Sequence, residues 1–224
     1  MGILDSLQNV LAESTEFGRQ IDQLMNDDAV AGKTSWEEVR SPGSRSTHKF
    51  KEISSARIEF KPDFSALLKP IFFMLLTVGG IGSFAVKLQE IPLAMLIVAS
   101  IIALSAVAAT VNKFYRGTTP VVFDQTIGCY WKSRQQPGHG DISENKNACL
   151  LNDIHAIQVI RSSSTSNSSS GRSNIFYQLN LVKEDGSRLN VTSTRNKSQL
   201  ELSAEEVSKF LSAPVWNFAT HSVM

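Results

Sequence analysis

Residues 175–192, IFYQLNLVKEDGSRLNVT, carry the clearest strand-turn-strand pattern in this 224-residue chain. Apolar side chains at every second position from Ile175 to Leu181 give one strongly apolar strand face. The segment Glu184–Ser187 is typical of a hairpin turn, and Arg188–Thr192 can form the returning strand. The stretch therefore predicts an antiparallel β-hairpin.

Further short strands are predicted before this hairpin. A run of Ser, Thr, Asn and Gly at 162–173 cannot bury enough apolar surface to order itself, and it predicts a loop between two strands. The strand-like runs are Val121–Asp124, Ile127–Lys132, Ala148–Leu151 and Ile154–Ile160.

A helix is expected to follow the strands. Ser203–Glu206 matches a capping box, which predicts a helix start, and Pro214 marks its end. One face of this helix would carry Leu200, Ala204, Val207 and Leu211. Residues 116–218 are therefore expected to form a small α+β domain, an antiparallel half-barrel closed by a C-terminal helix. That order resembles pleckstrin-homology-like (PH-like) domains.

Two apolar stretches, Pro70–Val86 and Ile91–Val111, are separated by only four residues. A helix needs about 20 mainly apolar residues to cross a bilayer. The spacing predicts a transmembrane hairpin within 64–112, with helices at about 66–87 and 91–111. A buried hairpin of a soluble domain is the alternative, but the second stretch has no polar side.

The distribution of charge and cysteine predicts where such a protein would lie. Lys and Arg gather on both outer flanks of the apolar stretches, so the positive-inside rule predicts that both termini are cytoplasmic. Two cysteines, Cys129 and Cys149, are compatible with a reducing compartment. We therefore expect an integral protein, of a bacterial inner membrane, with the lipid bilayer as one partner. A net charge of +1 argues against nucleic acid as a partner.

The N-terminal 30 residues have apolar side chains at helical spacing, among them Leu7, Leu11, Ile21 and Leu24. Most of the charges between them are acidic, which disfavours an anionic lipid surface. Residues 1–30 are thus expected to form an amphipathic helix that packs on a protein surface, either this protein's own or a partner's. Residues 31–63 are expected to form a linker.

The sequence predicts no catalytic residue, metal site or cofactor site. The histidines at positions 48, 139, 155 and 221 are scattered and lack a ligand spacing. His155 follows Asp153 by two positions, which we interpret as turn chemistry. Neither a nucleophile elbow nor a glycine-rich nucleotide loop is present in the sequence. We therefore expect a protein that is not an enzyme.

Several scattered positions carry a family resemblance: Phe123-Asp124, Gly128, Ile154-x-x-Ile157-x-x-Ile160, Tyr177, Arg188 and the segment 204–215. In these positions and in its layout, the chain resembles the photosystem I assembly factor of cyanobacteria and chloroplasts. The resemblance implies two close membrane helices, a PH-like domain and a scaffold role. Gln125 stands where the family is expected to have arginine.

These patterns predict a non-catalytic integral membrane protein that acts as an assembly or scaffold subunit of a membrane complex, with protein partners or as a homo-oligomer. A membrane-anchored module that senses lipid headgroups or small ligands is one alternative, and an accessory subunit of a membrane enzyme is another. The three aromatic residues among the candidates also suit core positions. The candidate contact residues are Leu7, Leu11, Ile21, Leu24, Trp131, Tyr177 and Trp216.

Overall fold

The computed structural model describes residues 3–39, 48–62, 119–138, 142, 145–165 and 173–219, and single residues or short runs between 72 and 115. Contacts divide the chain into a larger unit (1–46, 50–60 and 120–224) and a smaller one (47–49 and 61–119). The candidate site lies in the larger unit.

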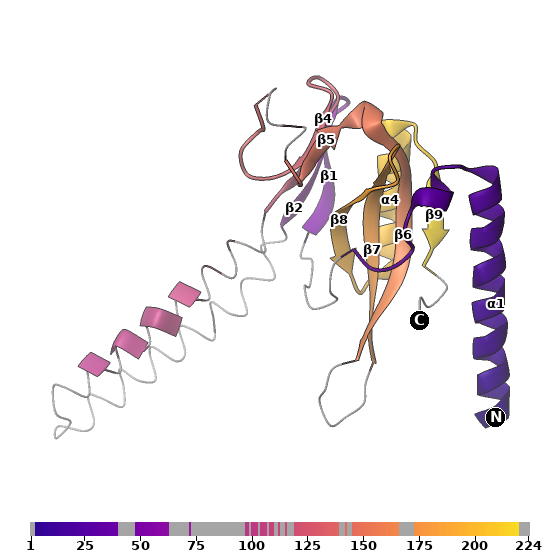
Figure 1. Ribbon diagram of the computed structural model, residues 1–224. Coiled ribbons are helices and arrows are strands. Elements are labelled where there is room, and N and C mark those ends of the chain that lie inside the picture. The colour runs from indigo at the N-terminus through magenta and orange to yellow at the C-terminus, as the bar shows by residue number, and fades with distance from the viewer. Residues whose placement is uncertain are drawn as a thin grey trace. The chain divides into compact units, whose positions relative to one another are not determined.

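The described strands form two sheets (Figure 1). The first has the order β1-β2-β3-β4-β5, and β2 to β5 pair antiparallel with their neighbours. Ile58 of β2 pairs with Phe123 of β3, so strands far apart in the sequence lie side by side. The strands are β1 His48–Ser54, β2 Arg57–Pro62, β3 Val121–Asp124, β4 Cys129–Lys132 and β5 Ala148–Leu150.

The second sheet has the order β8-β7-β6-β9. The pairs β6–β7 and β7–β8 are antiparallel, whereas β9 lies parallel to β6. Its strands are β6 Ile154–Thr165, β7 Ser173–Lys183, β8 Arg188–Thr194 and β9 Val215–Phe218. The helices are α1 Ile3–Asp27 and α4 Lys197–Leu211, and two short 3-10 helices are η1 Ala31–Lys33 and η2 Leu151–Asp153.

The main core takes side chains from both sheets and from α4. Phe60, Phe123, Ile157, Leu179 and Val207 are all buried in it. Burying such side chains stabilises the fold by about 1.5–3 kcal/mol each. The predicted helix face is confirmed, because α4 contributes Leu200, Ala204 and Val207 to this core, with Leu211 packed at its margin.

The predicted hairpin turn is also confirmed. It joins β7 to β8, and Gly186 has a φ of +80°, a left-handed conformation that glycine adopts without the usual steric cost. The N–H of Gly186 donates to the carbonyl of Lys183 at 2.8 Å.

The predicted capping box is wrong. Helix α4 begins at Lys197, and its N-cap is Asn196, whose Oδ1 accepts from the N–H of Gln199 at 3.1 Å. Ser203 lies inside the helix, where its hydroxyl donates to the carbonyl of Gln199 at 2.9 Å. The earlier start places Leu200 in the helix and in the core, and an Asn cap serves as well as a Ser cap.

The predicted membrane hairpin is corrected by the structure. Within the described parts of the chain, no helix combines the length and apolar character that crossing a membrane requires. Most of the predicted spans, 66–87 and 91–111, lie outside the described residues. An apolar stretch in the sequence shows only the composition of a segment. Crossing a bilayer also requires that the segment form a helix of about 20 residues. The integral-membrane localisation with cytoplasmic termini is therefore not retained.

The predicted fold class, a membrane helical hairpin plus a PH-like α+β half-barrel, is wrong. The described chain consists mostly of antiparallel strands in two sheets, with few helices. Strands β1 and β2 lie within the predicted linker, and β9 follows the helix that was expected to close the domain. These strands join the sheets through pairs that are distant in sequence, such as Ile160 with Phe218, and local periodicity does not reveal such pairs.

Candidate functional site

A segment after α1 crosses the outer face of the second sheet. We name Asp28–Val39 the covering segment. Figure 1 shows it, in indigo to violet, leaving the end of α1 and passing over β6 and β7. Apart from η1 it has no regular secondary structure, and Ser35, Glu37 and Val39 are exposed. It therefore lies on the sheet as a surface segment, not as part of the main core.

Beneath the covering segment, amide side chains form a row across three strands. Nδ2 of Asn190 on β8 donates to Oδ1 of Asn180 on β7 at 3.0 Å, and Nδ2 of Asn180 donates to Oε1 of Gln158 on β6 at 3.2 Å. Gln158 and Asn180 are completely buried. Buried amides need partners to offset their loss of hydration, so the row fixes the polar character of this face.

Three side chains of the sheet bind main-chain atoms of the covering segment. Nε2 of Gln158 donates to the carbonyl of Ser35 at 3.2 Å, and Nη1 of Arg188 donates to the carbonyl of Glu37 at 2.7 Å. The N–H of Val39 donates to Oε1 of Gln178 at 3.2 Å. Nη1 of Arg188 also donates to Oε1 of Gln158 at 3.0 Å, which ties these contacts to the amide row. The sheet thus holds this segment by groups that every peptide has.

Side chains of the covering segment add one hydrogen bond and one charge interaction. The hydroxyl of Ser162 donates to the carboxylate of Glu38. Glu37 lies close enough to Arg188 to favour the charged guanidinium, although burial has the larger effect and lowers the pKa of Arg188. Acidic side chains at 37 and 38 therefore match the groups that the sheet presents.

Aromatic rings anchor the segment at the β9 edge of the sheet. The ring of Trp36 lies 5.8 Å from that of Trp216 and 4.9 Å from that of Phe218, the latter edge to face. Phe17 of α1 packs edge to face on Phe218 at 5.7 Å. We name this group, with the buried Val30, Ala31, Ala156 and Val182, the aromatic cluster. Among the described residues, Nε1 of Trp36 is buried without a hydrogen-bond partner.

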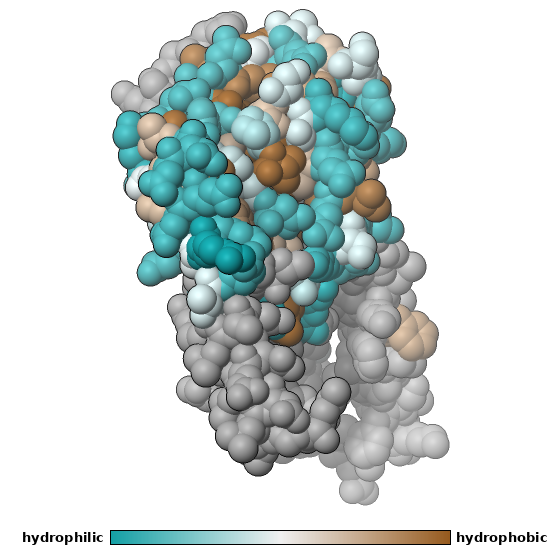
Figure 2. Space-filling model, turned by 90° about the vertical axis from the view of Figure 1, so that its right-hand side faces the viewer, coloured by the Kyte–Doolittle hydropathy of each residue, from teal (hydrophilic) through white to brown (hydrophobic). Residues whose placement is uncertain are grey.

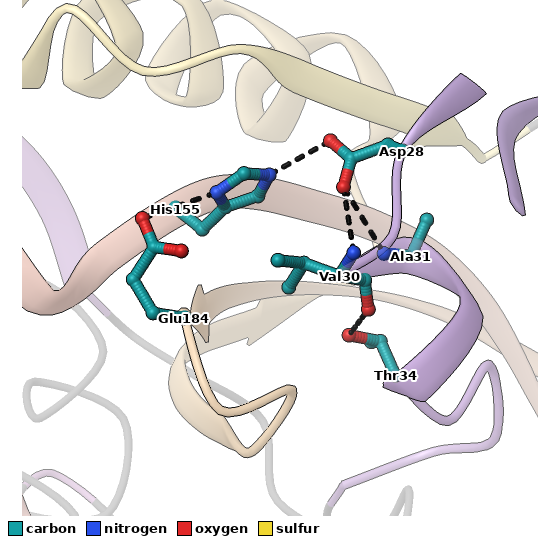
Figure 3. A network of polar contacts seen from close by, with 6 residues as sticks. All are labelled: Asp28, Val30, Ala31, Thr34, His155 and Glu184. Atoms are coloured by element: carbon teal, nitrogen blue, oxygen red, sulfur yellow. Dashed lines mark hydrogen bonds and ion pairs between the residues drawn. The ribbon is translucent and has the colours of Figure 1, made fainter.

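A histidine between two carboxylates links the covering segment to the sheet (Figure 3). Nε2 of His155 on β6 lies 2.7 Å from Oδ2 of Asp28, and its Nδ1 lies 3.2 Å from Oε1 of Glu184. Oδ1 of Asp28 accepts from the N–H groups of Val30 at 2.8 Å and Ala31 at 3.3 Å, which fixes the start of the segment.

The carboxylates and the imidazole shift each other's titration. The hydrogen bond to Asp28 raises the pKa of His155 above 6.5; burial opposes this and Glu184 assists. Burial acts to raise the pKa of Asp28, but the hydrogen bonds from His155, Val30 and Ala31 outweigh it, and the pKa lies below 3.8. Both ring nitrogens of His155 face carboxylates, so the arrangement is an anchor, and the described residues contain no group of three His, Cys, Asp or Glu that could hold a metal ion.

The cysteines lie in the interior, away from this surface. Cys129 and Cys149 are both buried. Burial raises the pKa of Cys149 to about 12, so its thiol is uncharged at neutral pH and unreactive as a nucleophile.

The structure brings three of the predicted contact residues together. Ile21 and Leu24 of α1 pack against the aromatic cluster, of which Trp216 is a buried member. The described part of α1 therefore packs on this protein's own sheet. Figure 2, which views the side that carries α1, shows a largely hydrophilic surface with scattered hydrophobic residues.

The other predicted contact residues lie elsewhere. Trp131 is buried with Val122 in a separate small core, and Tyr177 is half-buried against the main core. Leu7 and Leu11 belong to the first turns of α1, and their side chains lie outside the described residues.

Sequence reasoning missed the most important residues of this site. His155 was assigned to turn chemistry with Asp153, whereas its partners are Asp28 and Glu184. Gln178 and Asn180, which alternate with the apolar residues of β7, were not among the candidate residues. A signal existed, because amides recur at 158, 180 and 190, but only the fold places them in one row.

Comparisons with protein-family models, with curated proteins and with solved structures return no match. The resemblance to the photosystem I assembly factor stays a prediction.

Proposed function

We propose that this protein is a non-catalytic interaction protein, with an assembly or scaffold role, whose second sheet binds a linear segment of a protein along its outer face. The observation that carries this proposal is the set of contacts from Gln158, Gln178 and Arg188 to main-chain atoms of Ser35, Glu37 and Val39.

Hydrogen bonds to main-chain atoms do not depend on the sequence of the bound segment. A carbonyl or N–H is present in any peptide, so the same three side chains can hold a different chain in the same place. Peptide-binding domains use main-chain hydrogen bonds for affinity and side-chain sites for specificity. The amide row and the aromatic cluster supply both kinds of group.

The covering segment has the properties of an occupant that can be exchanged. Val30 and Ala31 are buried in the aromatic cluster and not in the main core, whereas Ser35, Glu37, Glu38 and Val39 are exposed. The unpaired Nε1 of Trp36 lowers the stability of its docked form, because a buried donor without a partner costs about 1–3 kcal/mol. Being tethered, the segment still competes strongly with a free peptide through its high effective concentration.

The test measures binding of a labelled peptide to the full chain. The peptide has the sequence of residues 28–39, DAVAGKTSWEEV, and binding is followed by fluorescence anisotropy. Trp36→Ala in the full chain removes the anchor of the covering segment, so this variant should bind the peptide at least about ten-fold more tightly than the wild type.

Val39→Ala is the matched control, because its side chain is exposed and its N–H contact with Gln178 does not need that side chain. It should bind the peptide as the wild type does. Asp28→Asn loosens the segment at its other end and serves as a second opened variant. Failure of both folded opened variants to bind the peptide would contradict the proposed function.

A further inference from the structure

We propose that the partner segment of this surface carries an aromatic residue followed by two acidic residues, as Trp36-Glu37-Glu38 does in the covering segment. This inference rests on the proposed function and adds the chemistry of the partner. Two features of the second sheet select that chemistry: an aromatic site beside β9 and a basic and hydroxyl site across β8 and β6.

Main-chain contacts and side-chain contacts alternate along the segment, and this alternation fixes its register on the sheet. Main-chain atoms of residues 35, 37 and 39 contact Gln158, Arg188 and Gln178. The side chains of the intervening residues, Trp36 and Glu38, contact the sheet. A partner held by the same main-chain bonds must therefore present its first side chain to the aromatic site and its third to Ser162.

The aromatic site requires a large flat side chain. Trp216 and Phe218 are buried and present their rings to position 36 at centroid distances of 5.8 and 4.9 Å. Ala156 and Val182, also buried, belong to the same cluster. A small aliphatic side chain cannot reach both rings, so an aromatic residue is preferred there.

The next two positions favour negative charge. Arg188 is half-buried, and its Nη1 donates both to Gln158 and to the carbonyl of Glu37, which places its charge beside the segment. Residue 37 lies beside this guanidinium, and a lysine or arginine there would face a like charge. At position 38, the Ser162 hydroxyl donates to a carboxylate, which is an acceptor with two oxygens.

The experiment uses the full-length Trp36→Ala chain and four 12-residue peptides. Against the wild-type peptide, the Trp36→Ala peptide should bind at least about ten-fold more weakly. The Glu37→Gln, Glu38→Gln peptide should bind several-fold more weakly, and the difference should shrink at high salt because the attraction to Arg188 is partly screened. A peptide with Ala29→Ser should bind like the wild type, because residue 29 is exposed and takes part in none of these contacts.

A charge exchange tests the contribution of Arg188 directly. Arg188→Glu in the opened chain should weaken binding of the wild-type peptide and strengthen binding of the Glu37→Lys peptide, reversing their order. If the Arg188→Glu chain does not fold, Arg188→Gln should remove the preference for acidic peptides without reversing it.

The outcomes separate this inference from the proposed function. Equal binding of all peptides would overturn the preference for an aromatic residue followed by two acidic residues and leave the proposed function standing. Absence of binding by every peptide would contradict the proposed function itself. Light scattering gives a further outcome: a stable dimer of the opened chain that excludes the peptide would identify a second copy as the occupant and overturn the inference.

Discussion

Nε2 of His155 lies 2.7 Å from Oδ2 of Asp28, although the two residues are 127 positions apart in the chain. The contact joins β6 to the residue that follows α1 and sets the point where the covering segment begins. Glu184, from the β7–β8 turn, holds the other ring nitrogen at 3.2 Å. The covering segment is therefore docked on the sheet at both ends, by this polar anchor and by the contacts of residues 35–39.

The docking of the covering segment should depend on pH. The raised pKa of His155 means that its charged form stabilises the folded state fully below 6.5, and this contribution is lost as the pH rises through the raised value. The lowered pKa of Asp28 gives stability that is present above 3.8 and is lost as the pH falls through the lowered value. The covering segment should thus be docked most tightly between pH 3.8 and pH 6.5.

Hydrogen exchange of residues 28–39, corrected for intrinsic rates, measures this effect. Protection should fall from about pH 5.5 to about pH 8.5 in the wild type. His155→Gln should abolish the dependence and cost about 0.5–1 kcal/mol near pH 5.5, as a partly exposed ion pair does. An unchanged pH profile in His155→Gln would show that another group controls docking.

The amide row should make Gln158 sensitive to substitution. Gln158→Leu keeps the volume but leaves Asn180, Arg188 and the carbonyl of Ser35 without their bonds to this side chain, so the free energy of unfolding should fall by about 2–3 kcal/mol. Urea denaturation monitored by circular dichroism gives this value. Gln23→Ala, at an exposed position of α1, should change it by less than about 0.5 kcal/mol. Similar losses in the free energy of unfolding for both variants would argue against a stabilising role of the amide row.

Two turn glycines should respond differently to alanine. Gly128 and Gly186 both have positive φ, so alanine should cost about 1 kcal/mol at either site. At Gly186 a Cβ would also lie 2.8 Å from Cβ of Lys33 in the covering segment, whereas Gly128 has open space around it. Gly186→Ala should therefore lose more stability than Gly128→Ala, and it alone should increase hydrogen exchange at residues 28–39.

Because the indole N–H of Trp36 is unpaired, replacing this tryptophan by phenylalanine should cost little stability. Trp36→Phe removes the buried donor while keeping an aromatic ring against Phe218, so the free energy of unfolding should stay within about 0.5 kcal/mol of the wild type. Trp36→Ala should lose about 2 kcal/mol, since it deletes a half-buried ring. A large loss in Trp36→Phe, measured by urea midpoints at constant slope, would mean that the N–H has a partner in solution.

The start of α4 can be tested by alanine substitutions at Asn196 and Ser203. Asn196→Ala removes the observed cap and should destabilise the protein by about 1 kcal/mol. Ser203→Ala deletes only a bond to the carbonyl of Gln199 within the helix and should change stability by less than about 0.5 kcal/mol. The reverse order would support a helix that begins at Ser203.

The sequence alone determined the local elements. Period-two apolarity predicted β7, the Glu184–Ser187 turn predicted its return as β8, and period 3.6 predicted the buried face of α4, because backbone geometry sets each of these within a few residues. Caps and hydropathy windows were less reliable. Asn196 replaced the expected Ser203, and the apolar composition of 64–112 did not correspond to a membrane-spanning helix among the described residues.

Only the tertiary structure decided what lies on the outer face of the second sheet. Gln158, Gln178 and Asn180 alternate with apolar residues as solvent-facing positions do, yet all three are buried. Their burial depends on a segment more than 120 positions away from Gln158, and His155 gains its carboxylate partner from the same segment. Such contacts follow from how the whole chain packs, since polar groups at this distance leave no periodic trace in the sequence.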